Sequence, residues 1–277
     1  MKKIIEKIRQ YPFIAAIAVT ILYFGCNFGF SLILNMLPDG LISQLVIELV
    51  CVAWPLALLF LFGQGRALRM GTMGQSFKTG LCFLILAGVI LVSNVLNTPA
   101  DAWKSTSAFV IGVIELIFIG VREEVIFRGI ATDLVARKYA NSTKGVYLTV
   151  FGVSFLFGAL HMQNLLADNA GIISVVTQSI MAWSIGSVFC AIYLRGGSIW
   201  GLALLHALFD AMLLFRSRFT TVVIENAGPA SFDLAQLVIC AVMFALALLL
   251  LRKKKMAGVI ERFQNHEKTA DLSGTVI

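Results

Sequence analysis

Four charged side chains lie close together inside an otherwise strongly apolar stretch, residues 107–136. They are Arg122, Glu123, Glu124 and Arg128. Each charge near the centre of a bilayer costs about 2.5–3.5 kcal/mol or more. A membrane helix therefore keeps such side chains only when they are paired with one another or take part in function.

Helical spacing assigns different surroundings to the two glutamates. Residues four positions apart share one helix face, so Glu124 can hold Arg128 as an ion pair. Glu123 is rotated by about 100° from Glu124 and has no partner on its own helix. One carboxylate is predicted to be held, and the other to be free for chemistry. The alternative is that all four charges only lock helices together.

Two of the three histidines also lie in apolar stretches. His161 follows Phe157 by one helical turn, and His206 precedes Asp210 by the same spacing, so each pair shares a face. A lone helical histidine is most often a packing residue, but polar side chains in membrane helices almost always face the bundle interior. The sequence therefore predicts that Glu123, Asp210 and the two histidines meet in one buried site.

The composition is that of a polytopic membrane protein. The 277 residues are 59% hydrophobic and 13% charged, and the mean hydropathy is +0.89, whereas soluble domains carry about 25% charged residues. The formal net charge of +7 is concentrated in short loops and at the termini, which indicates cytoplasmic loops and not nucleic-acid binding. The five cysteines lie in apolar segments without metal-like spacing, so they are expected to be free packing residues.

Eight apolar stretches have lengths near the roughly 20 residues that a transmembrane helix needs. They are residues 11–37, 41–62, 77–97, 107–136, 145–161, 172–194, 198–215 and 232–251. Lys and Arg are enriched in the loops on one side, so the positive-inside rule places both termini in the cytoplasm. The predicted fold is all-α: a helical membrane bundle of about eight spans forms a single domain over residues 1–251. A basic, polar cytoplasmic tail is expected over residues 252–277, loosely ordered from residue 256 onward.

Three motifs, in order and on separate predicted spans, carry a family resemblance. They are Glu-Glu-x-x-x-Arg from Glu123, Phe-x-x-x-His from Phe157, and His-x-x-x-Asp from His206. Together they resemble the CPBP family of intramembrane proteases, also called Abi, which includes the type II CAAX prenyl endopeptidases. Each motif alone is weak, but all three in this order are fairly specific. The resemblance covers about residues 107–215, the expected catalytic core.

This resemblance implies hydrolysis of a peptide bond in a membrane-associated or lipidated peptide. Glu123 and His161 would hold and deprotonate a water molecule, and His206 and Asp210 would complete the site as further ligands or as stabilisers of the oxyanion. The neighbouring glutamate–arginine ion pair would brace the catalytic helix. Phe157 would contact the substrate.

The resemblance leaves open whether the water is bound to a metal. The two histidines and the carboxylates of Glu123 and Asp210 form an acceptable zinc set, although the His-Glu-x-x-His signature is absent. The family commonly has Asn at position 210, whose amide can donate to an oxyanion, whereas an ionised Asp only accepts hydrogen bonds. Asp210 therefore favours a zinc ion as cofactor, or a role in orienting His206.

Two other kinds of function remain compatible with the sequence. A catalytically silent membrane scaffold, or an immunity protein against a peptide toxin such as a bacteriocin, would use the polar cluster only for architecture. A proton-coupled transporter would use intramembrane Glu and His as a relay, but no inverted repeat with Gly- or Pro-interrupted spans is detectable. The expected partners are membrane lipids and a peptide or lipidated protein substrate, in a prokaryotic cytoplasmic membrane. The sequence does not determine an oligomeric state.

Overall fold

The structure is a computed structural model that describes residues 10–34, 36, 41–166, 171–222 and 234–273. Within these residues the chain is helical, and β-structure is limited to two isolated bridges. The predicted all-α fold class is confirmed. All five cysteines are free, as predicted.

The long helices follow one another in the order of the predicted spans. The elements are α2 (Pro12–Leu34), α3 (Leu41–Leu61), η1 (Gly65–Arg69), α4 (Met73–Thr79), α5 (Leu81–Leu96), η2 (Ala100–Ala102), α6 (Thr106–Glu124), η3 (Val125–Thr132), α7 (Asp133–Tyr139), α8 (Thr143–Leu160), η4 (His161–Leu166), α9 (Ile172–Leu194), α10 (Ile199–Leu213), α11 (Phe215–Phe219), α12 (Leu234–Leu250) and α13 (Lys253–Ser273). Each predicted span contains one long helix: α2, α3, α5, α6, α8, α9, α10 or α12.

Only some of these helices are long and apolar enough to cross a membrane by themselves. In the described part of the chain, three segments meet that requirement, namely Pro12–Phe30, Thr143–Leu166 and Ile172–Leu194. Two bent pairs, α4 with α5 and α12 with α13, raise the number to five if each pair is one span. These apolar helices are those of an integral membrane protein. A count of eight spans and cytoplasmic termini stay predictions.

The predicted span over residues 77–97 is broken at Gly80. There α4 and α5 meet at an angle of 78°. A Cβ at Gly80 would lie 3.0 Å from the side chain of Leu205 and 3.2 Å from that of Ile192. The absent side chain therefore lets the bend pack against α10 and α9, a tertiary contact that hydropathy alone does not reveal.

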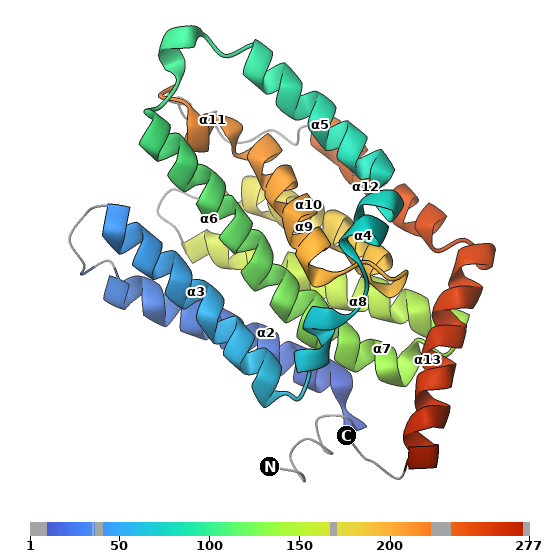
Figure 1. The fold of residues 1–277 in the computed structure, drawn as a ribbon. Helices are drawn as coiled ribbons and strands as arrows, with labels where there is room; N and C mark the ends of the chain where they lie inside the picture. The colour runs from blue at the N-terminus through green and yellow to red at the C-terminus, as the bar shows by residue number, and fades with distance from the viewer. Residues whose placement is uncertain (1–9, 35, 37–40, 167–170, 223–233, 274–277) are drawn as a thin grey trace.

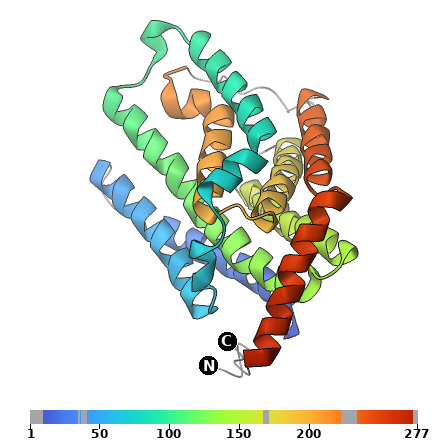
Figure 2. The same ribbon diagram turned by 45° about the vertical axis from the view of Figure 1, so that its right-hand side comes forward.

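The continuous helix formed by α6, η3 and α7 runs through the middle of the bundle (Figure 1). It contacts α10 on one side and α2 and α3 on another, while α8 also contacts its η3 part. Figure 2, turned by 45°, shows α12 and α13 at the edge of the bundle, where α12 packs on α9. Every residue of Val125–Thr132 is buried. The charges at the α6–η3 junction consequently lie among other helices.

The C-terminal segment forms a helix, so the expectation of a loosely ordered tail is wrong for residues 256–273. There α13 bends by 65° away from α12. Its side chains Met256, Val259 and Phe263 are buried and join the main hydrophobic core. Their spacing of three and four residues is that of an amphipathic helix. The apolar face fixes α13 to the bundle and leaves Lys253, Lys254, Lys255 and Glu261 exposed.

Candidate active site

The close approach of α6 and α10 determines where the site forms. A Cβ at Gly120 on α6 would lie only 2.4 Å from the carbonyl oxygen of Ala203 on α10. Gly120 precedes the two glutamates by about one turn, and Ala203 precedes His206 by the same interval. The two backbones are therefore in contact within one turn of all three site residues, and only glycine permits that contact.

Glu124 is fully buried and holds two partners with one carboxylate oxygen. Its Oε1 accepts a hydrogen bond from Nη1 of Arg128 at 2.9 Å and one from Nδ1 of His206 at 2.8 Å. Arg128 also donates from Nη2 to the carbonyl oxygen of Gly186 on α9, at 3.0 Å. The predicted ion pair between Glu124 and Arg128 is confirmed. Its extension to His206 and Gly186, which ties four helical segments together, was not predicted.

Two phenylalanine rings enclose this ion pair. The guanidinium carbon of Arg128 lies 5.3 Å from the ring centre of Phe157 and 5.6 Å from that of Phe189, within the range of cation–π attraction. The same rings lie 5.9 and 5.6 Å from the imidazole of His206. Phe157 is buried and packs against the charged groups, so its contact with a substrate stays a prediction.

The second ring nitrogen of His206 faces two carboxylates. Its Nε2 lies 3.5 Å from Oε2 of Glu123 and 3.8 Å from Oδ2 of Asp210. The side chains of Glu123 and Asp210 are 13% and 16% exposed, against 5% for His206. Because the ring donates through Nδ1 to Glu124, a bare Nε2 lone pair would face carboxylate lone pairs and be repelled. A proton or a water molecule is therefore expected between these groups.

His161 lies at the edge of this group, as the first residue of η4. Its Nδ1 is 2.9 Å from the carbonyl oxygen of Phe157, so the ring donates there and leaves Nε2 as an acceptor. Asp210 interacts electrostatically with His161, as it does with His206 and Glu123. The structure thus brings the predicted residues into one region. The described side chains show no direct hydrogen bond from His161 to the other three.

The donor types of this region suit zinc, but their arrangement does not. Imidazole and carboxylate groups are zinc ligands, and the bond from His206 to Glu124 is of the kind that orients a metal-binding histidine. Across the described residues, however, no group of three or more His, Cys, Asp or Glu side chains could hold a metal ion. The side chains would have to move together to bind one.

Arg122 has a partner that no spacing rule identifies. Its Nη1 lies 3.6 Å from Oε2 of Glu48 on α3. A second ion pair on the same helix joins Glu115 to Arg218, at 2.7 Å. Both pairs connect residues far apart in the sequence, so a helical-spacing argument cannot find them. Arg122 also interacts electrostatically with Glu123, which places it beside the site.

The predicted helix over residues 107–136 is continuous but changes its winding after Glu124. The following segment, Val125–Thr132, is a π-helix. Such segments are rare and are frequently found at functional sites. The π-helix contains Arg128 and begins directly after the two glutamates. Its winding therefore determines where Arg128 lies relative to Glu124. A hydrophobic period of 3.6 residues does not distinguish it from an α-helix.

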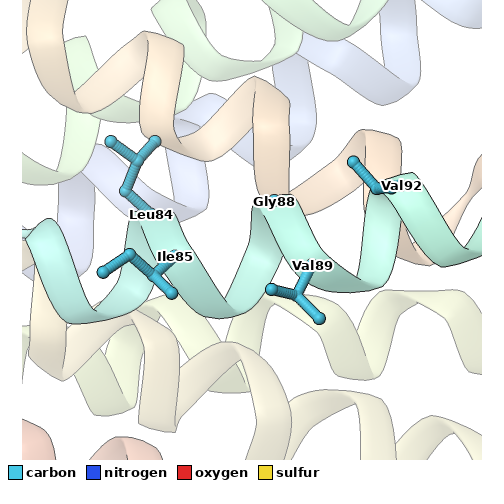
Figure 3. Close-up of a pocket in the computed structure, with 5 residues that line it drawn as sticks. All are labelled: Leu84, Ile85, Gly88, Val89 and Val92. Carbon is cyan, nitrogen blue, oxygen red and sulfur yellow. The ribbon is translucent and has the colours of Figure 1, made fainter.

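A hollow on α5 is unrelated to these groups. It is lined by Leu84, Ile85, Gly88, Val89 and Val92 (Figure 3). All five residues are apolar, and none belongs to the site described above. On a membrane helix such a surface is suited to lipid chains, and it offers no group for chemistry.

The structure thus places a cluster of glutamate and histidine side chains among the apolar helices of the bundle. Residues 104–212 match the family described as type II CAAX prenyl endopeptidase Rce1-like. The match confirms the predicted resemblance, and it includes every predicted site residue. No curated protein and no solved structure matches the chain. Residues 104–212 are therefore similar to an Rce1-like domain, a family that suggests a CAAX-type intramembrane protease.

Proposed function

We propose that this protein is an intramembrane endopeptidase that cleaves a membrane-associated or lipidated peptide with a water molecule activated by Glu123. The observation that carries the proposal is the contrast between the two adjacent glutamates. Glu124 is buried and bonded to Arg128 and His206, whereas Glu123 is partly exposed and lies 3.5 Å from Nε2 of His206. A purely architectural cluster has no use for a carboxylate that stays partly exposed beside a histidine at membrane depth.

Glu123 is suited to act as the general base. A water molecule bonded to its carboxylate would also lie within reach of Nε2 of His206, and His161 would hold it from another side. The carboxylate takes a proton from the water as the water oxygen attacks the carbonyl carbon of the substrate. It then returns the proton to the leaving amine nitrogen as the peptide bond breaks. General acid–base catalysis of this kind contributes about 10²- to 10⁴-fold in rate.

The buried ion pair serves this chemistry by fixing His206. Donation from Nδ1 to Glu124 keeps one tautomer and one ring orientation, so that Nε2 stays turned toward Glu123. Asp210 lies on the same face of α10 and accepts hydrogen bonds when ionised, so its proposed role is to orient His206 and the bound water. The predicted zinc ion, with Glu123, His161, His206 and Asp210 as its ligands, stays a prediction to be tested by chelation.

The setting that we propose is the cytoplasmic membrane of a prokaryote, a proposal supported by the short basic loops. The substrate then reaches the site from the membrane or from its cytoplasmic surface. Membrane lipids and the peptide itself are the partners that the proposed reaction requires.

The test is proteolysis in liposomes with a panel of prenylated and leader-type peptides. Wild type is compared with Glu123→Gln and His161→Ala, and with Glu261→Gln on the exposed side of α13 as a matched control. We expect wild type and the control to cleave, and both site variants to lose cleavage. Equal cleavage by all four proteins would point to a contaminating protease. Absence of cleavage, with cellular function retained by Glu123→Gln, would favour a scaffold or immunity protein.

A further inference from the structure

Two apolar helices end side by side, and an arginine follows each of them. The helices α9 and α12 pack against one another. Arg195 comes directly after the last residue of α9, and Arg252 lies at the bend between α12 and α13 (Figure 1). The guanidinium groups of Arg195 and Arg252 interact electrostatically. The two helix ends therefore place positive charges close together at one end of the bundle.

A third arginine reaches the same place from α13. Nη1 of Arg262 lies 4.0 Å from the position that a Cβ on Gly196 would occupy. Gly196 follows Arg195 and has a φ of +94°, a conformation of the turn after α9 that favours glycine. The bend of 65° after α12 directs α13 so that Arg262 meets this turn. Arg195, Arg252 and Arg262 thus form an arginine cluster at the end of α9.

The arginine cluster has no counter-ion in the described part of the protein. Its three guanidinium groups form no ion pair or side-chain hydrogen bond with the described residues. Asp133 interacts electrostatically with Arg262, but it is fully buried and accepts a hydrogen bond from Nε of Arg137 at 2.8 Å. Glu261 is exposed, and neighbouring residues of a helix do not face each other. Positive charge is therefore in excess at this position.

The repulsion within the cluster acts on Arg195. Partial burial and the charge of Arg252 lower the pKa of the Arg195 guanidinium from its ordinary value. A positive charge at the C-terminal end of a helix is favoured by the helix dipole, which accounts for Arg195 at the end of α9. The dipole does not account for two further guanidinium groups at the same turn, because like charges repel one another. A bound anion would convert this repulsion into attraction.

We propose that Arg195, Arg252 and Arg262 bind the phosphate group of an anionic membrane lipid. Arginine binds phosphate through pairs of parallel hydrogen bonds. The arginine cluster lies where α9, a helix long and apolar enough to span a membrane, comes to its end, and basic sites between the ends of membrane helices suit lipid head groups. The exposed lysines at 253–255 add attraction for a negatively charged surface. The bound lipid fastens α13 to the ends of α9 and α12.

The first experiment titrates phosphatidylglycerol into the purified protein in micelles of detergent and phosphatidylcholine. Wild type is compared with Arg195→Gln/Arg252→Gln and with a matched control, Lys78→Gln/Lys144→Gln, which removes the same charge from exposed lysines. Because hydrogen bonds to a charged group are lost, the apparent Kd for phosphatidylglycerol should rise about 10- to 100-fold in the arginine variant. It should rise less than about threefold in the lysine control. Native mass spectrometry counts the lipids that stay bound.

Thermal unfolding distinguishes lipid binding from a purely structural role. A ligand that binds only the folded state raises the Tm, so phosphatidylglycerol should raise the Tm of wild type and of the lysine control, but not that of the arginine variant. In phosphatidylcholine alone, the arginine variant should unfold no earlier than wild type, because it lacks the repulsion between Arg195 and Arg252. The single variant Arg252→Gln, at an exposed position, should show a smaller loss of the same sign and keeps the test usable if the double variant does not fold.

Inorganic phosphate at matched ionic strength tests the source of the anion. We expect a smaller rise in Tm than with phosphatidylglycerol, since free phosphate has no acyl chains that hold it beside the helix ends. An equal rise, absent from the arginine variant, would assign the cluster to soluble phosphate and overturn its assignment to a lipid. If phosphatidylglycerol does not stabilise wild type, or stabilises the arginine variant equally, the cluster is not a lipid site. None of these measurements involves cleavage, so the proposed protease function is tested separately.

Discussion

Glu123 and Glu124 are neighbours in the sequence but belong to two contrasting regions of the molecule. The buried brace consists of Glu124, Arg128 and His206, whose side chains are almost fully enclosed and bonded to one another. The accessible side consists of Glu123, Asp210 and Arg122, which are partly exposed and have contacts of 3.5 Å or more. His206 belongs to both regions, because each of its ring nitrogens faces one of them.

The comparison teaches how a membrane protein can keep reactive groups at low stability cost. Charges in a low-dielectric interior are stable when their hydrogen bonds are complete, and breaking such a pair costs about 3–5 kcal/mol. In the brace, Oε1 of Glu124 holds both Arg128 and His206, whereas the neighbouring groups remain open, which is the condition for binding water and substrate. If this is correct, substitutions in the buried brace should lower stability, and substitutions on the accessible side should lower activity.

The largest effect is expected from Glu123→Gln, on the accessible side. Loss of the general base should lower kcat/KM by about 10²- to 10⁴-fold. The thermal unfolding midpoint should stay close to wild type, because this carboxylate completes no buried hydrogen bond. Parallel measurement of peptide cleavage and unfolding checks both parts. Full activity in this variant would show that Glu123 is not the general base, so that the two glutamates would not differ in the proposed way.

Arg128→Met tests the buried brace. Leaving the buried Glu124 carboxylate with only its hydrogen bond from His206 should destabilise the protein by about 3–5 kcal/mol, as measured by unfolding in mixed micelles. The double variant Glu124→Gln/Arg128→Met removes both charges and should recover a large part of that stability. If the single variant unfolds like wild type, the ion pair does not brace the helices.

Gly120→Ala tests the contact that brings the two regions together. A methyl group facing the carbonyl of Ala203 must push α6 and α10 apart, and overpacking of this kind costs about 1–3 kcal/mol. We expect cleavage to fall by about tenfold, because the distance from Glu123 to His206 would grow. The control is Gly88→Ala on α5, where a Cβ meets nothing within 4 Å. A similar loss in both variants would contradict the role of this contact.

The smallest effect concerns the predicted zinc ion. Because the described side chains are not gathered around a metal position, we expect a chelator to change wild-type cleavage by less than about twofold. Asp210→Asn should behave like wild type toward the chelator and lose no more than about tenfold in kcat/KM. Loss of wild-type activity on chelation, with recovery on adding zinc, would instead assign these residues as ligands.

Much of the site could be predicted from the sequence because helical geometry is regular. A spacing of four residues was enough to pair Glu124 with Arg128 and to place His206 on the same face as Asp210. It was also enough to leave Glu123 without a partner on its own helix. The cost of charge in a bilayer then implied that these groups face the interior. The spacing of Met256, Val259 and Phe263 is that of an amphipathic helix and would have predicted α13. The prediction of a loosely ordered tail relied on its polar composition instead.

Other features were decided only by the tertiary structure, since they join residues that the sequence keeps far apart. The bond from His206 to Glu124 depends on the approach of α6 and α10 at Gly120, and the pair of Arg122 with Glu48 depends on the packing of α3. The π-helix after Glu124 has no distinct hydrophobic period. Local spacing fixed which charges share a helix face, and the packing of separate helices decided which of them are buried and bonded and which remain partly exposed.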